Sequence, residues 1–243
     1  MKIQQEVAYF AGCAVNFIDP HIGKSVVNVL RRNEVQLLFP DQKCCGIPQL
    51  TSGDRASFFE HATLNVRSLH AVDCDIVVTC PTCALALKSY YPKMLESRQA
   101  NEVAQRTFDI MEYLLKLKKQ GALTTDFHPL NIRVMYHAPC HLRATNEDAI
   151  VDRLDLLRLI PEVRIKQADK GCCGMGGTFG SKKENYPLSM AIGEKLFEEI
   201  RQSSPDIVST DCPACALQIH QGTGMSASHP ITVIERAYGD FGQ

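Results

Sequence analysis

The sequence predicts an α/β fold made of two pseudo-symmetric repeats, each a small parallel sheet flanked by helices, with cysteines at the carboxyl ends of the strands. Three observations lead to this prediction. One cysteine pattern occurs twice, short β-rich runs alternate with helical patterns in both copies, and the cysteines follow the predicted strands. Strands that alternate with helices form a parallel sheet covered by those helices.

The cysteine pattern is a single cysteine, then a Cys-Cys-Gly doublet, then a Cys-Pro-x-Cys tetrad. The two spacers hold 30 and 34 residues in the first copy, and 31 and 38 in the second. Matched spacers of this kind indicate an internal repeat. The repeated cysteines are Cys13, Cys44, Cys45, Cys80 and Cys83, then Cys140, Cys172, Cys173, Cys212 and Cys215.

The predicted strands are short runs rich in β-branched and aromatic residues. They cover residues 7–11, 35–39 and 75–79 in the first copy, and 132–137, 163–167 and 206–210 in the second. The boundary between the copies falls within residues 121–131, so we assign the first repeat to 1–127 and the second to 128–243.

Helical patterns fill the gaps between the strands. Asp19 is an N-cap followed by Pro20 at the first helical position. The apolar stripes that predict helices are Ile22, Val26, Val29 and Leu30; Phe58, Ala62 and Leu69; Ile150, Leu154 and Leu157, after a Thr145–Asp148 capping box; and Leu188, Ile192, Leu196 and Ile200. Each repeat therefore reads β-α-β-α-β-α, which a parallel sheet requires.

The five thiols of each repeat should converge, because ligands of open parallel sheets bind outside the carboxyl ends of the strands. In each tetrad the first cysteine can cap a helix, and the second falls on its first turn, where the helix dipole favours a thiolate. We expect Gly46 and Gly174 to bring backbone N–H groups close to sulfur. Lys182 and Lys183 could offset negative charge there, or simply lie in a solvated loop.

Five converging thiols exceed the four ligands of a tetrahedral zinc site or of a cubane iron–sulfur cluster. Either one thiol is redundant, or the bound group is an open or fused iron–sulfur cluster in which one thiolate bridges two irons. We favour the cluster, because structural zinc or buried free thiols would not explain the doublets. Cys74 lies outside the pattern and is expected to be a small buried hydrophobe.

Two histidines, His137 and His141, flank Cys140 and have no counterparts around Cys13. A ligand or proton role is open to them, and we interpret them as satisfied polar residues at a strand end. The sequence offers no flavin site and no paired acid and base for substrate oxidation, so we predict no catalytic residues.

The composition is that of an ordinary globular protein, with 243 residues, 45% hydrophobic and 22% charged. A formal net charge of −1 gives no reason to expect nucleic acid as a partner. No apolar run approaches the roughly 20 residues that span a bilayer, and the N-terminal residues lack a signal-peptide pattern. We expect a cytoplasmic protein that meets the inner face of the membrane only through partners.

The paired motifs resemble the cysteine-rich CCG family. That family includes the B subunit of heterodisulfide reductase, the lactate-utilisation and glycolate oxidase iron–sulfur subunits, and the C subunit of anaerobic glycerol-3-phosphate dehydrogenase. The resemblance covers essentially the whole chain. The segments GKSVVNVLRRNEVQLLFPDQKCCGIP, YHAPCH, GSKKENYPLSMAIGEKLF and HPITVIERA look most like the glycerol-3-phosphate dehydrogenase branch.

The resemblance implies up to two noncubane 4Fe-4S clusters, each bound by the five cysteines of one repeat. It also implies an electron-transfer subunit of glycerol metabolism that relays electrons from flavoprotein dehydrogenase subunits towards the quinone pool. That branch normally carries an N-terminal ferredoxin-like domain, and no C-x2-C-x2-C-x3-C-P run is present here. Either the sequence is truncated or a separate ferredoxin-like chain supplies that relay.

Two other functions fit the motifs. A heterodisulfide-reductase-like enzyme would reduce a disulfide at an open cluster. A metal-free thiol–disulfide oxidoreductase would use the CPTC and CPAC dithiols instead.

Overall fold

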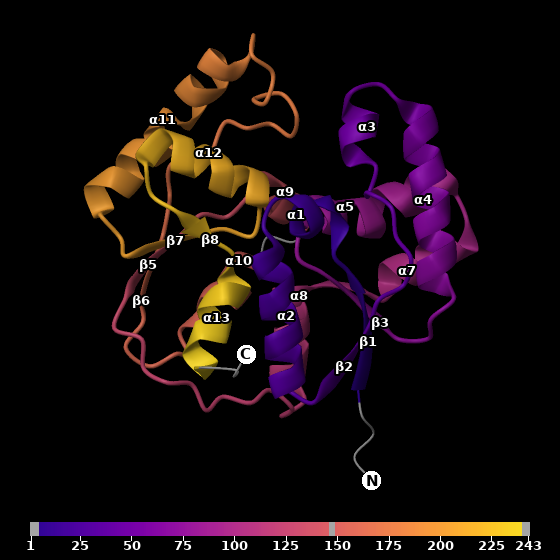
Figure 1. Cartoon of the computed structure of the whole chain (residues 1–243), viewed down its shortest axis with the longest axis horizontal. Helices are drawn as coiled ribbons and strands as arrows, with labels where there is room; N and C mark the ends of the chain where they lie inside the picture. The colour runs from indigo at the N-terminus through magenta and orange to yellow at the C-terminus, as the bar shows by residue number, and fades with distance from the viewer. Residues whose placement is uncertain (1–4, 146–148, 240–243) are drawn as a thin grey trace. The chain divides into compact units, whose positions relative to one another are not determined.

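The structure is a computed structural model that describes residues 5–145 and 149–239. The chain divides into two compact units, unit 1 (Met1–Thr124) and unit 2 (Thr125–Gln243). Each unit contains one parallel four-stranded sheet flanked by helices (Figure 1). The predicted α/β class with two parallel sheets is therefore confirmed.

Unit 1 opens with the strand that carries the first cysteine at its end. Its strands are β1 (Gln5–Phe10), β2 (Val35–Leu38), β3 (Asp75–Val78) and β4 (Thr107–Asp109). Its helices are α1 (Gly12–Phe17), α2 (Pro20–Arg32), α3 (Ile47–Thr51), α4 (Arg55–His70), α5 (Pro81–Leu85), the π-helical turn η1 (Ala86–Tyr90), α6 (Tyr91–Leu95), α7 (Arg98–Gln105) and α8 (Ile110–Lys119).

Unit 2 repeats the same order with fewer helices. Its strands are β5 (Arg133–Tyr136), β6 (Arg164–Gln167), β7 (Ile207–Ser209) and β8 (Ala227–Ser228). Its helices are α9 (Cys140–Thr145), α10 (Ala149–Leu157), α11 (Tyr186–Ser203), α12 (Pro213–Thr223) and α13 (Pro230–Tyr238).

The two sheets have the same topology. Their strand orders are β2-β1-β3-β4 and β6-β5-β7-β8, and every pairing between neighbours is parallel. The central strands, β1 and β3 in unit 1 and β5 and β7 in unit 2, therefore end side by side at one edge of their sheet. This arrangement places the loops that follow them next to one another.

Each sheet has one strand more than the β-α-β-α-β-α pattern predicts. The additional edge strands, β4 and β8, contain three and two residues. Segments this short carry no alternation of apolar and polar residues, so only the backbone pairing with β3 and β7 defines them.

The predicted helix starts are mostly confirmed. Asp19 accepts a hydrogen bond from the backbone N–H of His21 at the start of α2, with Pro20 in the first turn. Cys80 and Cys212 are the N-caps of α5 and α12, each followed by proline. The Thr145–Asp148 capping box lies outside the described residues, because the placement of Asp148 is not described.

The prediction for the buried face of α11 is partly wrong. Leu188 and Ile192 are 57% and 46% exposed, whereas Leu196 and Ile200 are fully buried. Phe197 completes the buried face, and α11 packs against α12 (Figure 1). A stripe drawn at four-residue spacing drifts around a helix of 3.6 residues per turn, which explains why its first half faces away from the core.

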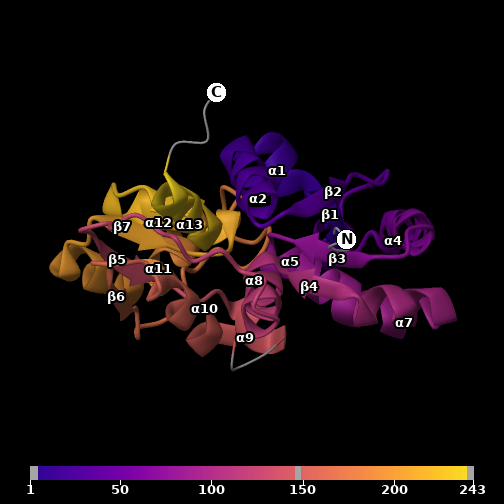
Figure 2. The ribbon, with the colours of Figure 1, turned by 90° about the horizontal axis from the view of Figure 1, so that it is seen from below.

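The helices complete the apolar cores that support the cysteine loops. In unit 1, α4 and α7 lie side by side (Figure 2), and the core that includes Phe58 and Leu69 of α4 also contains Cys45 and Cys83. In unit 2, a core that includes Phe197 of α11 contains Cys173 and Cys215. Across the described residues, no helix combines the length and apolar character needed to cross a membrane.

Candidate metal centres

Each cysteine of the repeated pattern follows the carboxyl end of a central or neighbouring strand. In unit 1, Cys13 lies in α1 after β1, the doublet lies between β2 and α3, and Cys80 follows β3. Unit 2 repeats this placement with Cys140 at the start of α9, the doublet after β6, and Cys212 after β7. The second tetrad cysteines, Cys83 and Cys215, lie in the first turn of α5 and α12.

The structure brings the five thiols of each unit together into one group, which we call a quintet. In unit 1 they form an unbroken series of side-chain contacts that runs Cys13, Cys44, Cys45, Cys83, Cys80. The Cys13 and Cys44 sulfurs are 3.9 Å apart. In unit 2 the series runs Cys140, Cys172, Cys173, Cys215, Cys212, and the Cys173 and Cys215 sulfurs are 3.0 Å apart.

Negative charge in unit 1 concentrates on the first cysteine of the doublet. Hydrogen bonds from Cys13 and Cys45 lower the pKa of Cys44 to about 2, and the Gly46 N–H and nearby His61 act in the same direction. The pKa of Cys13 and that of Cys45 are raised, because each loses its hydrogen bond to Cys44 on ionising and each is partly or fully buried. The Cys44 thiolate therefore accepts hydrogen bonds from two neighbouring thiols.

Unit 2 has the same electrostatic pattern. Hydrogen bonds from Cys140 and Cys173 lower the pKa of Cys172 to about 2, again with help from the glycine N–H that follows the doublet. Hydrogen bonding to Cys172 raises the pKa of Cys173 to about 12. The pKa of Cys215 is raised by its hydrogen bonds to Cys173 and Cys212 and by burial. The doublets of the two quintets thus agree in electrostatics as well as in order.

Burial divides each quintet into an inner pair and an outer set. The inner pair is the second doublet cysteine with the second tetrad cysteine, and all four of these residues are at most 4% exposed. The outer cysteines of unit 1 are half-buried, whereas Cys140 and Cys172 in unit 2 are exposed. Each set of sulfurs therefore extends from an apolar core towards the protein surface.

The glycines after the doublets supply backbone N–H groups to sulfur. The Gly174 N–H donates to the Cys172 sulfur at 3.4 Å, and the Gly46 N–H makes the equivalent bond to Cys44. Both residues have a positive φ, 86° and 81°, which glycine adopts without strain. A Cβ on Gly174 would lie 2.0 Å from the Ser189 carbonyl oxygen, so no side chain fits there.

The predicted lysines are placed differently from the glycines. Lys182 and Lys183 are exposed, in the turns that precede α11. This placement agrees with the solvated-loop interpretation of both side chains.

The eleventh cysteine, Cys74, lies outside both quintets, as predicted. It is half-buried and packs against the apolar core of unit 1.

Two side chains that the sequence analysis missed hold the doublet loop of unit 1. Asn65 of α4 accepts from the Lys43 N–H at 2.7 Å and donates to the carbonyls of Lys43 and Cys44 at 3.2 Å. Tyr91 of α6 donates to the Cys45 carbonyl at 3.0 Å. A signal did exist for Asn65, since it is a polar residue within the apolar stripe of a helix.

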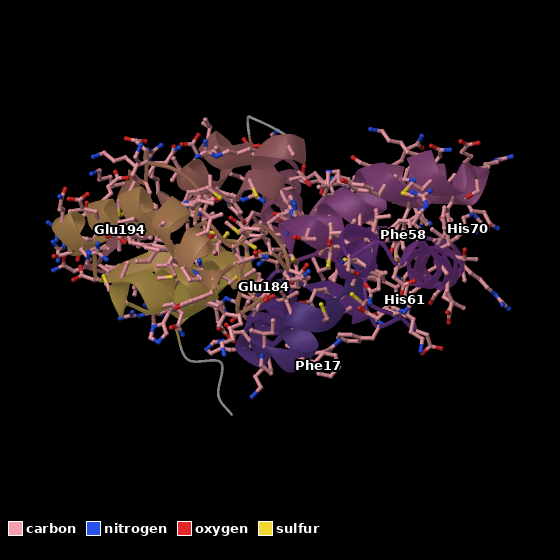
Figure 3. The ribbon with its side chains drawn as sticks, turned by 90° about the horizontal axis from the view of Figure 1, so that it is seen from above. Phe17, Phe58, His61, His70, Glu184 and Glu194 are labelled. Carbon is pink, nitrogen blue, oxygen red and sulfur yellow. The ribbon has the colours of Figure 1, made fainter. Side chains whose placement is uncertain are left out.

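Phe58 and His61 lie on the same helix, as Figure 3 shows, and Phe58 packs behind Gly46.

Helix α11 does the same for the doublet loop of unit 2. Glu199 accepts from the N–H groups of Asp169 and Lys170 at 3.1 and 3.0 Å. Ser189 donates to the Gly174 carbonyl at 2.8 Å and accepts from Gln218 of α12. In both units, therefore, a long helix that follows the doublet in the chain, α4 or α11, carries polar side chains that fix the loop.

A buried ion pair distinguishes unit 2 from unit 1. Asp211, which directly precedes Cys212, accepts from the Tyr136 hydroxyl at 2.5 Å and from Arg153 at 2.7 Å. Burial alone would raise the pKa of Asp211, but the Arg153 guanidinium brings it below its usual range. In unit 1 the equivalent Tyr9 meets the Thr79 hydroxyl at 3.4 Å instead.

A histidine also enters the quintet of unit 2. The imidazole of His137 and the sulfurs of Cys173 and Cys215 lie within 4.8 Å of one another, and all three residues are buried. Burial lowers the pKa of His137 to about 4, so its ring is neutral near pH 7. The interpretation of His137 as a satisfied polar residue stays a prediction. His141 is half-buried.

The donor set suits a thiophilic metal group. Each quintet offers five sulfurs with no carboxylate among them, and backbone N–H groups point at the sulfurs of both doublets. Soft thiolate donors select iron–sulfur clusters, zinc and Cu(I) over hard cations. N–H groups directed at sulfur are a general feature that tunes iron–sulfur clusters. The residues present therefore fit an iron–sulfur group.

The chain belongs to the cysteine-rich domain (CCG) family, whose model matches residues 7–88 and 134–220. Each match starts in the first strand of one unit and ends beyond the tetrad, so each contains one complete quintet.

Three relatives match nearly the whole chain. It is 36% identical to the C subunit of anaerobic glycerol-3-phosphate dehydrogenase from Escherichia coli, over 97% of this chain and 60% of the relative. It is 30% identical to the B subunit of fumarate reductase (CoM/CoB) from Methanothermobacter marburgensis, over 96% and 47%. It is 32% identical to an uncharacterized iron–sulfur protein of Methanocaldococcus jannaschii, over 88% and 40%. The chain thus spans about half the length of these relatives.

Proposed function

We propose that this chain is an iron–sulfur electron-transfer subunit of an anaerobic, flavin-dependent dehydrogenase that acts on glycerol 3-phosphate or a related substrate. It would relay electrons from the flavoprotein subunits towards quinone, and a separate ferredoxin-like chain could share the relay. The chemistry on the organic substrate would take place in the partner. Each repeat, predicted at residues 1–127 and 128–243, would hold one noncubane 4Fe-4S cluster on its five cysteines.

The observation that carries this proposal is the pair of matching thiol quintets at the carboxyl ends of two parallel sheets. An iron–sulfur cluster, when bound, accepts and passes on one electron at a time. The protein itself would hold the sulfurs in place through Asn65, Tyr91 and Glu199, and would direct N–H groups at them. The relatives support the class of function, because their names include an iron–sulfur protein and subunits of two oxidoreductases.

A second candidate is a cluster enzyme that reduces a disulfide substrate, as in heterodisulfide reductase. The exposure of Cys140 and Cys172 favours it, since these sulfurs lie at the surface of unit 2, where a substrate could approach. The relative from Methanothermobacter marburgensis is itself named as part of a reductase.

The metal-free thiol–disulfide oxidoreductase has less support. Hydrogen bonding to Cys83 lowers the pKa of Cys80 to about 7, which is typical of the attacking thiol of such a dithiol. This function would use only the two tetrad cysteines of each unit, however, and it leaves the other three thiols of each quintet without a role.

Anaerobic purification followed by iron, acid-labile sulfide and EPR measurements tests the proposal. We expect about four irons per repeat and an EPR signal from a cluster in at least one redox state. Mixing the protein with the flavoprotein dehydrogenase and glycerol 3-phosphate should then reduce the clusters, and a quinone analogue should reoxidise them. A colourless, iron-free protein that exchanges disulfides would contradict the proposal.

The electron relay and the disulfide-reducing enzyme differ in the compound that reoxidises the reduced clusters. If the chain is a relay, clusters reduced with dithionite stay reduced when a mixed disulfide is added and are reoxidised by a quinone analogue with the partner present. Rapid reoxidation by the disulfide alone, with release of two thiols per two electrons, would favour the disulfide-reducing enzyme instead.

A further inference from the structure

His137 occupies a position in unit 2 that an apolar residue occupies in unit 1. Both positions follow a buried tyrosine of the central strand, Tyr9 or Tyr136, and both precede the first cysteine by three residues. The residue in unit 1 is Phe10, the last residue of β1. Otherwise the two quintets have the same order of contacts and the same inner pair. The two centres differ in the exposure of their outer cysteines, in the buried Arg153–Asp211 pair of unit 2, and in the residue at this position near the inner pair.

In unit 1 the residue at this position is apolar and packs with the inner pair. Phe10 belongs to the same buried cluster as Cys45 and Cys83, and it is fully buried. The Cβ position of Gly12 lies 3.6 Å from the Phe10 ring and 3.0 Å from the Cys83 sulfur, so ring and sulfur border the same small space. A phenyl ring at this place offers no hydrogen bond to sulfur.

In unit 2 the same space contains an imidazole. A ring nitrogen of His137 lies within 4.8 Å of the sulfurs of Cys173 and Cys215, and the residue is only 3% exposed. A neutral imidazole carries one N–H, and a buried N–H without an acceptor is energetically unfavourable. The sulfurs of Cys173 and Cys215 are acceptors that lie close to this ring.

Unit 1 does have a histidine near its doublet, but in a different place. His61 comes from α4 and acts on the outer cysteine, Cys44. It is half-buried, and no group of a histidine with two cysteine sulfurs comparable to that around His137 occurs among the described residues of unit 1. The surroundings of the inner pair thus distinguish the units.

We propose that His137 donates a hydrogen bond to the sulfur ligands Cys173 and Cys215, and that this bond raises the reduction potential of the centre in unit 2 above that in unit 1. The inference rests on the proposed function, because it requires a redox-active cluster. A hydrogen bond to a thiolate withdraws electron density from the cluster and favours the form with one more electron. His137 is therefore a positioning and tuning residue, which need not be a metal ligand.

A higher reduction potential in unit 2 gives the electron flow a direction. The centre in unit 2 is reduced in preference to the centre in unit 1, so electrons pass from unit 1 to unit 2 and then towards an acceptor. On reduction the cluster gains one electron from its donor, and the imidazole keeps its proton. No bond of the protein is made or broken.

Redox titration followed by EPR, on protein labelled with ¹⁵N-histidine, tests the inference. The wild type should show two potentials, and the centre with the higher potential should have a weak ¹⁵N coupling typical of a hydrogen-bonded histidine. In His137→Phe that coupling should disappear. The equilibrium constant for one-electron reduction of the same centre should fall about tenfold, which is about 59 mV. Iron content should stay that of the wild type.

Three further variants provide controls. His137→Gln keeps an N–H donor and should restore most of the potential. His61→Phe should leave the higher potential unchanged, and Phe10→His should raise the lower one. An unchanged potential and an unchanged coupling in His137→Phe, with full iron content, would overturn the inference and leave the proposed function standing. A strong coupling typical of direct ligation would also overturn it, whereas absence of iron from the wild type would refute the proposed function itself.

Discussion

Gly174 combines two requirements that only glycine meets. Its backbone has a positive φ, and its missing side chain leaves room for the Ser189 carbonyl of α11, which would lie 2.0 Å from a Cβ. Gly177 is three residues further along the same loop and also has a positive φ, but nothing lies within 4 Å of its Cβ position. Comparing alanine variants of the two glycines therefore separates the effect of backbone strain from that of the close approach of the Ser189 carbonyl.

We expect Gly174→Ala to lower the free energy of unfolding by about 2–5 kcal/mol, and to reduce the iron bound by unit 2. A left-handed alanine costs about 1–2 kcal/mol, and the clash with α11 adds about 1–3 kcal/mol. Urea denaturation and iron analysis measure the two effects. The matched control, Gly177→Ala, should cost about 1 kcal/mol and keep full iron content. Equal losses in both variants would show that the close approach is unimportant.

Among the secondary-structure elements, the long helices α4 and α11, which follow the doublets in the chain, support the metal-binding loops. In unit 1 the amide of Asn65 on α4 makes three hydrogen bonds to the backbone of the doublet loop, and in unit 2 Glu199 on α11 binds two backbone N–H groups. These bonds hold the loop in the conformation that presents its N–H groups to sulfur. The geometry of the sulfurs therefore depends on helices that contribute no ligand themselves.

Replacing Asn65 by alanine should destabilise the protein by about 2 kcal/mol, because the Lys43 N–H and two carbonyls lose their partner. The iron of unit 1 should be lost more readily to a chelator, while that of unit 2 is retained. The rate of iron release to a coloured chelator reports this directly. Thr63→Ala, on the exposed face of the same helix, is the control and should change stability by less than about 0.5 kcal/mol. Identical release rates in the two variants would argue against a supporting role for Asn65.

At the scale of the whole molecule, the chain contains the same sheet and the same quintet twice. Each quintet lies entirely within one unit, since no cysteine of unit 1 is needed to complete the series in unit 2. The two centres should therefore be lost independently.

Cys44→Ser should remove or convert only the centre of unit 1, and Cys173→Ser only that of unit 2. Each variant should retain roughly half of the wild-type iron, and the double variant almost none, because a hydroxyl is a poor substitute for a bridging or terminal thiolate. Iron analysis with EPR of the three proteins measures this. If one substitution eliminated both centres, the two units could not be independent.

The repeat, the fold class and the membership of both quintets could be predicted from the amino-acid sequence. This was possible because cysteine spacing and strand periodicity are local patterns, and the carboxyl ends of parallel strands always meet at one edge. The N-caps Cys80 and Cys212 were predictable for the same reason, since a cap and its proline are neighbours in the chain.

The remaining features depend on contacts between segments that are far apart in the chain. The edge strands β4 and β8 are defined by pairing with distant residues. The exposed half of α11 is the part of that helix that α12 does not cover. The bond from Asn65 to the doublet loop, the buried Arg153–Asp211 pair and the approach of His137 to the inner sulfurs join residues far apart in sequence. Such contacts arise only when the sheet brings separate segments together, so no local pattern encodes them.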